Sequence, residues 1–179
     1  FLLKLSKKKI RIGILGGTFD PPHLGHVYIS KIGIKKFKLD KLLWVITKKN
    51  PLKKKPFLNI KMRLKLSKEI TRKEKKIFVK YFNNKIKTNN TFDLLNYLKS
   101  KNNNSKIYFL IGSDNLIKFH KWKNWKEIPK LAKLVVFARP NHTYKALNSV
   151  SSKTLKRNDW IYVNSRKINI SSSLIRKFW

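Results

Sequence analysis

Six short apolar runs recur along the chain and predict β-strands. These runs are continuous rather than alternating with polar residues, which is typical of strands buried on both faces of a parallel sheet. They lie at residues 9–15, 42–47, 76–81, 106–111, 133–138 and 160–163. The pattern therefore predicts a sheet of five or six strands, most of them parallel.

Amphipathic patterns with helical spacing fill the stretches between these strands. They predict helices at 23–37, 59–71, 91–101, 114–120 and 124–132, with a last helix that opens at Ser171. The polar stretches 48–57, 83–90, 102–105 and 139–158 are predicted to be loops. Strands that alternate with helices favour the α/β class, here a Rossmann-like doubly wound sheet. At this length we expect one domain over residues 1–179.

The net charge is strongly positive, because 44 Lys and Arg residues face only 8 Asp and Glu, for a formal charge of +36. Most of the cations are lysines, and they are spread over every segment rather than gathered in one stripe. We interpret the charge as a compositional background with a preference for anionic substrates. No specific nucleic acid partner is expected, only non-specific binding at low salt. A basic RNA-binding protein is the alternative from a different class.

Cysteine is absent from the chain, which excludes disulfides and thiolate metal sites and fits a reducing compartment. No apolar run approaches the roughly 18 residues that a membrane span needs. The first residues, FLLKLSKKKI, are too short and too charged for a signal peptide. We therefore expect a cytoplasmic protein with no membrane partner.

The segment GGTFDPPHLGH follows the first predicted strand directly. Gly16 and Gly17 let the backbone approach an anion at the end of that strand. Asp20, followed by two prolines, is the expected N-cap of the next helix. His23 and His26 are three residues apart and share a face of the first helical turn, where the helix dipole is positive. The segment predicts a binding site for a phosphate chain.

A second candidate site is the segment ISSSLIR near the end of the chain. Ser171 or Ser172 is a natural N-cap for the last predicted helix. Ser172 and Arg176 are four residues apart and share one helix face. A hydroxyl, free backbone N–H groups and a guanidinium that converge in this way suit a phosphate chain.

Together these two segments resemble the HxGH and ISSTxIR signatures of a nucleotidylyltransferase superfamily. Further segments resemble, in the same order, those of bacterial nicotinate mononucleotide adenylyltransferases. The matching segments are HLGH at 23–26, NPLK at 50–53, TFD at 91–93, GSDNLIKFHKWKNWKEI at 112–128, ARP at 138–140 and ISSSLIR at 170–176. The resemblance covers nearly the whole chain.

The resemblance implies transfer of AMP from ATP to nicotinate mononucleotide, which gives nicotinate adenine dinucleotide and pyrophosphate in NAD biosynthesis. It implies three sets of residues: a catalytic set of His23, His26 and Arg176, an ATP-binding set of Gly16, Gly17, Thr18, Phe19, Ser171, Ser172, Ser173 and Arg176, and an acceptor-binding set of Thr91, Asp114, Trp122, Lys53 and Arg139. The Trp122 ring is expected to stack on the pyridine ring. Lys53 stands where many relatives place a histidine, and Arg139 either reaches the substrate or stabilises its own loop.

The chemistry that the residues permit agrees with this reaction. A phosphate monoester has a second pKa of about 6, so at neutral pH the acceptor is ionised and needs no general base. What the reaction needs is positioning and positive charge at the transferred phosphorus. The few acidic residues are too scattered to hold two metal ions, so we expect Mg²⁺ to arrive on the ATP phosphates.

Two points stay open at this stage. Adenylyl transfer to nicotinamide mononucleotide or to phosphopantetheine would use the same ATP site with a different acceptor pocket. Relatives usually continue beyond the second signature, so the single domain is either compact or truncated at its C-terminus.

Overall fold

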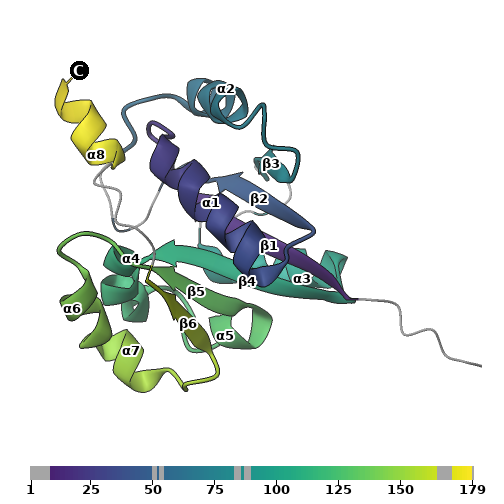
Figure 1. The fold of residues 1–179 in the computed structure, drawn as a ribbon, viewed down its shortest axis with the longest axis vertical. Coiled ribbons are helices and arrows are strands. Elements are labelled where there is room, and N and C mark those ends of the chain that lie inside the picture. The colour runs from purple at the N-terminus through teal and green to yellow at the C-terminus, as the bar shows by residue number, and fades with distance from the viewer. Residues whose placement is uncertain are drawn as a thin grey trace, which may run out of the picture.

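A six-stranded, all-parallel sheet forms the centre of the computed structural model of the chain, which describes residues 9–49, 52, 55–82, 86, 90–164 and 171–178. The strands follow the order β3-β2-β1-β4-β5-β6 (Figure 1). They are β1 (Ile10–Gly17), β2 (Lys41–Ile46), β3 (Ile77–Lys80), β4 (Ser105–Gly112), β5 (Lys133–Phe137) and β6 (Trp160–Val163). The structure therefore confirms the predicted doubly wound α/β fold.

Helices cover both faces of this sheet. They are α1 (Leu24–Phe37), α2 (Ile60–Ile70), α3 (Thr91–Lys101), α4 (Ser113–Lys118), α5 (Ile128–Leu131), α6 (Thr143–Leu147), α7 (Val150–Thr154) and α8 (Ser172–Ile175), with the 3₁₀ turns η1 (Phe119–Lys121) and η2 (Arg176–Phe178). One apolar core lies between the sheet and the helices α1 and α2, and a second lies between the sheet and the helices α3, α4 and α5. The sheet is thus the middle of three layers.

Strand β2 shows why its run of apolar residues is continuous. Successive side chains of a strand point to opposite faces. Leu42, Trp44 and Ile46 pack into the core under α1, whereas Leu43 and Val45 pack into the other core. All five side chains are buried, so neither face of the strand offers a place for a polar residue.

The predicted loop at 139–158 is wrong in part, because it contains the short helices α6 and α7. Each helix has five residues, which is too short for a helical period to show in the sequence. Small side chains allow close packing here, since Ala146 and Ser151 are fully buried. The Ser149 hydroxyl caps α7 by accepting a hydrogen bond from the Ser152 N–H at 3.2 Å.

The two signature segments meet at one end of the sheet. The C-terminal helix α8 lies beside the amino end of α1 (Figure 1). The Ser172 hydroxyl donates a hydrogen bond to the carbonyl of Pro21 at 2.8 Å, across 151 positions of sequence. The fold thus brings the first and last motifs of the chain to the same place.

Candidate active site

A cavity of about 1040 Å³ opens at the carboxyl ends of the strands. From β1, the strands β2 and β3 follow one another toward one edge of the sheet, and from β4 the strands β5 and β6 follow toward the other edge. The strand order therefore reverses between the neighbours β1 and β4. Open parallel sheets bind ligands in the crevice at such a point. The cavity is therefore where the topology places a ligand.

The predicted site residues that the structure describes all line this one cavity. They are Gly16, Gly17, Thr18, Phe19, His23, His26, Thr91, Asp114, Trp122, Arg139, Ser171, Ser172, Ser173 and Arg176. Lys53, also predicted at the site, lies outside the described residues. Residues from the two halves of the sheet and from both ends of the chain thus face a common space.

Phe19 holds the turn after β1 in an unusual conformation. Its φ is 48°, in the left-handed region that a bulky side chain seldom adopts. The ring is buried, lies 4.8 Å from the Trp44 ring and 4.7 Å from the His26 ring, and is stacked on the former. Packing on both sides compensates for the strained backbone, which is common at functional sites.

Asp20 is not the N-cap of α1, contrary to the prediction. The helix begins at Leu24 and its N-cap is His23, three residues later. Asp20 is instead buried, and its carboxylate accepts the N–H groups of Phe57 and Leu58, each at 2.8 Å. The carboxylate therefore ties the segment before α2 to the phosphate-binding turn rather than capping its own helix.

His26 is held in one orientation by its neighbours. The backbone N–H of His23 donates to His26 Nδ1 at 3.2 Å, and the two imidazole rings lie 3.8 Å apart. Because Nδ1 accepts a hydrogen bond, the neutral ring carries its proton on Nε2. Behind the ring, Trp44 Nε1 donates to the Ser30 hydroxyl, which donates to the His26 carbonyl. The ring is thus an oriented hydrogen-bond donor.

His23 is buried, with 4% of its surface exposed, and neither ring nitrogen has a hydrogen-bond partner. An unpaired buried polar group is costly, and an unpaired one beside a cavity is the sign of a ligand position. Burial, and secondly the positive charge of Arg139, lowers the pKa of His23 to about 4. At neutral pH the imidazole is therefore an uncharged donor.

Asp114 and Arg139 form an ion pair in the lining of the cavity. Arg139 Nη1 lies 3.4 Å from Asp114 Oδ2, and Asp114 Oδ1 is buried without a partner. A Cβ on Gly112 would lie 2.4 Å from Asp114 Oδ1 and 3.0 Å from Arg139 Nε. Glycine at the end of β4 is therefore what lets this pair approach the strand.

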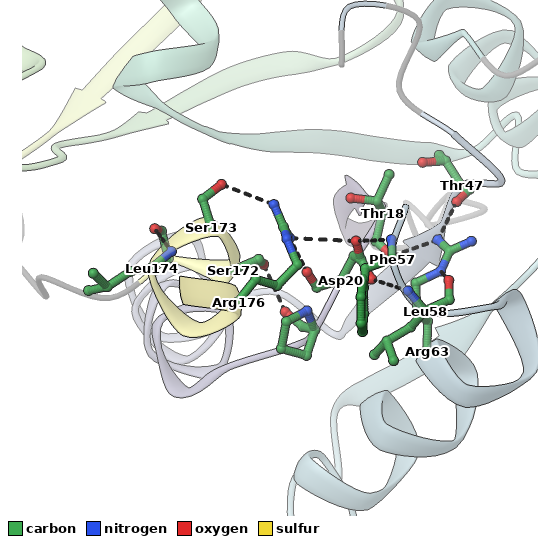
Figure 2. A network of polar contacts seen from close by, with 12 residues as sticks. Thr18, Asp20, Thr47, Phe57, Leu58, Arg63, Ser172, Ser173, Leu174 and Arg176 are labelled. Carbon is green, nitrogen blue, oxygen red and sulfur yellow. Dashed lines mark hydrogen bonds and ion pairs between the residues drawn. The ribbon is translucent and has the colours of Figure 1, made fainter. Parts of the chain in front are cut away.

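The C-terminal signature is anchored to the first one. Ser171 caps α8 by accepting the Leu174 N–H at 3.1 Å. The Arg176 guanidinium donates to the backbone carbonyl of Asp20, lies 3.5 Å from its carboxylate and contacts the Ser173 hydroxyl at 3.2 Å (Figure 2). The serine hydroxyls and the guanidinium of this segment thus lie close together at the end of the described chain.

Part of the cavity lining is aromatic. The half-buried Trp122 ring lies 5.1 Å from the Phe119 ring and 6.2 Å from the Phe109 ring, both of them buried. Thr91 is the first residue of α3, whose N-cap Asn90 accepts the Asp93 N–H at 2.9 Å. An aromatic side chain and a helix start thus line the same cavity as the signature segments.

Sequence reasoning missed several residues of the site. Asn115 and Lys121 also line the cavity, and nothing in their local pattern distinguishes them from solvated residues. Arg63 supports the wall from behind. Its signal was present in the sequence, since it is one of few arginines in a chain whose cations are mostly lysine.

Two searches of the described residues gave negative results. They contain no group of three or more His, Cys, Asp or Glu side chains placed to hold a metal ion. None of the helices in this part of the chain has the length and apolar character needed to cross a membrane.

The fold and the cavity define a nucleotide-binding α/β protein, with phosphate-binding groups at the switch point of a parallel sheet. A family model described as cytidylyltransferase-like matches residues 14–178. The chain therefore belongs to the cytidylyltransferase-like family and, within it, to the nicotinate-nucleotide adenylyltransferases.

Individual relatives agree with this assignment. The chain is 46% identical over 173 residues to a probable nicotinate-nucleotide adenylyltransferase of Pelagibacter ubique, covering 97% of this chain and 96% of that protein. It is 32% identical over 189 residues to a protein of the same name from Mesorhizobium japonicum, covering 96% of each chain.

Solved structures share the fold. The Plasmodium falciparum nicotinic acid mononucleotide adenylyltransferase in complex with NaAD superposes with a TM-score of 0.73 at 22% identity, covering 94% of this chain and 83% of that one. A putative nicotinate-nucleotide adenylyltransferase from Vibrio parahaemolyticus gives a TM-score of 0.65 at 19% identity, covering 94% of this chain and 85% of that one.

The lowered pKa of His23 predicts a pH dependence of stability. Between pH 6.5 and about 4 the unfolded chain takes up a proton on His23 that the folded protein does not. The free energy of unfolding should therefore fall as the pH drops through this window, and His23→Gln should remove that part of the fall. Urea unfolding at a series of pH values measures both.

The difference between wild type and variant isolates His23 from the carboxylates that titrate in the same range. His142→Gln, at the start of α6 and outside the cavity, is the matched control and should keep the wild-type profile. A flat difference curve between wild type and His23→Gln would contradict a neutral, buried His23.

Proposed function

We propose that this protein transfers AMP from ATP to nicotinate mononucleotide and releases pyrophosphate, forming nicotinate adenine dinucleotide. The observation that carries the proposal is the shared cavity, which His23 and His26 line together with Ser171, Ser172, Ser173 and Arg176 from the other end of the chain. Ser172 and Arg176 bond the carbonyls of Pro21 and Asp20, just before the histidine signature. The names of the relatives at 46% and 32% identity support the same reaction.

ATP lies, in this proposal, between the two signatures. The end of β1 at Gly17, the turn that follows it and the start of α8 offer backbone N–H groups to the phosphates. His26 offers the proton on Nε2, and Arg176 offers a guanidinium that pairs with phosphate oxygens in a bidentate manner. These groups also suit the charge that develops at the α-phosphorus in the transition state.

Nicotinate mononucleotide occupies the opposite half of the cavity, in this proposal. The Trp122 ring stacks on the pyridine ring, and Thr91 at the start of α3 faces its carboxylate. Asp114 accepts a ribose hydroxyl through Oδ1, the oxygen that lacks a partner. Arg139 adds positive charge to the lining, and the resemblance to the family assigns Lys53 to acceptor binding as well.

The reaction is an in-line displacement. An oxygen of the acceptor phosphate attacks the α-phosphorus of ATP, the bond from that phosphorus to the bridging oxygen breaks, and pyrophosphate leaves with the electron pair. The acceptor oxygen is already ionised near neutral pH, so no side chain has to remove a proton. Mg²⁺ enters with ATP as part of the substrate and offsets charge on the phosphates.

Pyrophosphate release with different acceptors tests the function. Purified protein with MgATP should release pyrophosphate fastest with nicotinate mononucleotide and at least about tenfold more slowly, in kcat/KM, with nicotinamide mononucleotide or phosphopantetheine. A faster reaction with either other acceptor would reassign the acceptor. Salt-resistant binding of a specific RNA without any turnover would favour the RNA-binding alternative.

Loss of the His26 donor should slow the chemistry. His26→Ala should lower kcat about a hundredfold or more, since removing one donor that faces developing charge has effects of this size. The variant also loses the His26 contacts with Phe19 and with the His23 N–H, so kcat is compared well below both melting temperatures. His142→Ala, outside the cavity, is the control and should retain wild-type turnover. A near-normal kcat in His26→Ala would reject the assigned role.

Trp122 should act on acceptor binding rather than on chemistry. Trp122→Ala should raise the KM for nicotinate mononucleotide about tenfold while the KM for ATP stays within twofold, which substrate titrations measure. Trp125→Ala is the matched control, because Trp125 also packs on Phe119 but does not line the cavity. Equal acceptor KM values for the two variants would contradict stacking by Trp122.

A further inference from the structure

Arg63 lies in α2 and is almost fully buried, with 2% of its surface exposed. Arginine is very seldom buried unless its charge is paired or its N–H groups are bonded. Burial lowers the pKa of Arg63, and the nearby Asp20 carboxylate opposes this effect. A chain rich in lysine thus places an arginine, whose pKa is high enough to stay protonated, behind the candidate site.

The guanidinium donates to four backbone carbonyls, and all of them belong to chain segments that surround the cavity. Nη1 bonds the carbonyls of Thr18 at 2.7 Å and Thr47 at 2.8 Å. Nη2 bonds the Lys48 carbonyl at 3.1 Å, and Nε bonds the Leu58 carbonyl at 3.0 Å. One planar group therefore joins the turn after β1, the end of β2 and the segment before α2 (Figure 2).

Asp20 also holds the segment before α2, one of the three segments that Arg63 joins. Its carboxylate accepts the N–H groups of Phe57 and Leu58, so residue 58 is held at its N–H by Asp20 and at its carbonyl by Arg63. The backbone carbonyl of Asp20 in turn accepts a hydrogen bond from Arg176. Leu58 and Asp20 thus connect Arg63 to Arg176 of the C-terminal signature.

Arg63 itself is not among the residues that line the cavity, whereas Thr18, Thr47, Lys48 and Phe57 are. It therefore acts on a ligand only through the backbone it holds. We propose that Arg63 is a positioning residue, which fixes three chain segments as one wall that binds the polyphosphate of ATP. The inference rests on the proposed function for the identity of the nucleotide.

Lysine cannot make the same set of hydrogen bonds as Arg63. The four carbonyls approach three different nitrogens of a flat, rigid fork, whereas an ammonium offers its donors from a single point. Arg63→Lys keeps the positive charge but leaves at least one carbonyl without its donor. The variant therefore separates the geometry of the fork from its charge.

Steady-state kinetics and nucleotide binding test the inference, at a temperature well below the melting point of each variant. Arg63→Lys should raise both the KM for ATP and the Kd of a non-hydrolysable ATP analogue at least tenfold. A merely structural role would lower the melting temperature and the active fraction but leave both constants unchanged. The two constants are therefore the informative readouts.

Arg11→Met is the matched control. Arg11 Nη1 donates to the Phe37 carbonyl at 3.1 Å, so it too bonds a backbone carbonyl. It lies near the amino end of β1, however, whereas the cavity opens at the carboxyl ends of the strands. The variant should lower the melting temperature while its KM for ATP and its analogue Kd stay within twofold of wild type. Analogue constants in Arg63→Lys within twofold of wild type, or raised equally in both variants, would overturn the inference.

Hydrogen exchange of the wild-type protein gives a test that needs no variant. A wall held in place before the nucleotide arrives predicts slow exchange of the Phe57 and Leu58 amides in the free protein; exchange at the rate of an open loop would overturn the inference. Because the analogue Kd does not depend on the acceptor, a wild type that binds ATP but never uses nicotinate mononucleotide would reject the proposed function and leave the role of Arg63 standing.

Discussion

The attachment of the C-terminal segment to the turn before α1 is the constraint on which the site depends. Helix α8 is short and has no buried residue, so apolar packing contributes little to its position. Polar contacts hold it instead: Ser172 bonds the Pro21 carbonyl, and Arg176 bonds the Asp20 carbonyl and faces its carboxylate. Asp20 is buried and bonded to the segment before α2, so it is a rigid partner for this attachment.

The cavity combines several charged side chains with oriented hydrogen-bond donors. His23 is neutral because burial and Arg139 lower its pKa, and His26 presents a donor because its Nδ1 is occupied. His23 thus offers hydrogen bonds at neutral pH without a charge, and His26 offers a donor in a fixed orientation. Such a site can hold two polyanionic substrates near each other, since oriented dipoles stabilise the charge that forms at the transferred phosphorus.

The sequence predicted those features that a single local requirement imposes on the residues. Strands buried on both faces must be continuously apolar, so all six were predicted. A serine N-cap of the last helix was predicted at Ser171 or Ser172, and it lies at Ser171. Prediction from the sequence failed where a residue's hydrogen-bond partners lie far along the chain. Asp20 resembles an N-cap, but its partners are the Phe57 and Leu58 amides, and no local pattern reveals them. Helices α6 and α7 were missed because five residues show no period, and Arg63 because its four acceptors are backbone atoms of other segments.

The most direct test is a crystal structure with a non-hydrolysable ATP analogue and Mg²⁺. The account predicts that the phosphates lie between the two ends of the chain, with contacts from His26 and from Ser172 or Arg176 to the same nucleotide. A nucleotide that contacts only one of the two signatures, or that binds elsewhere on the surface, would contradict it.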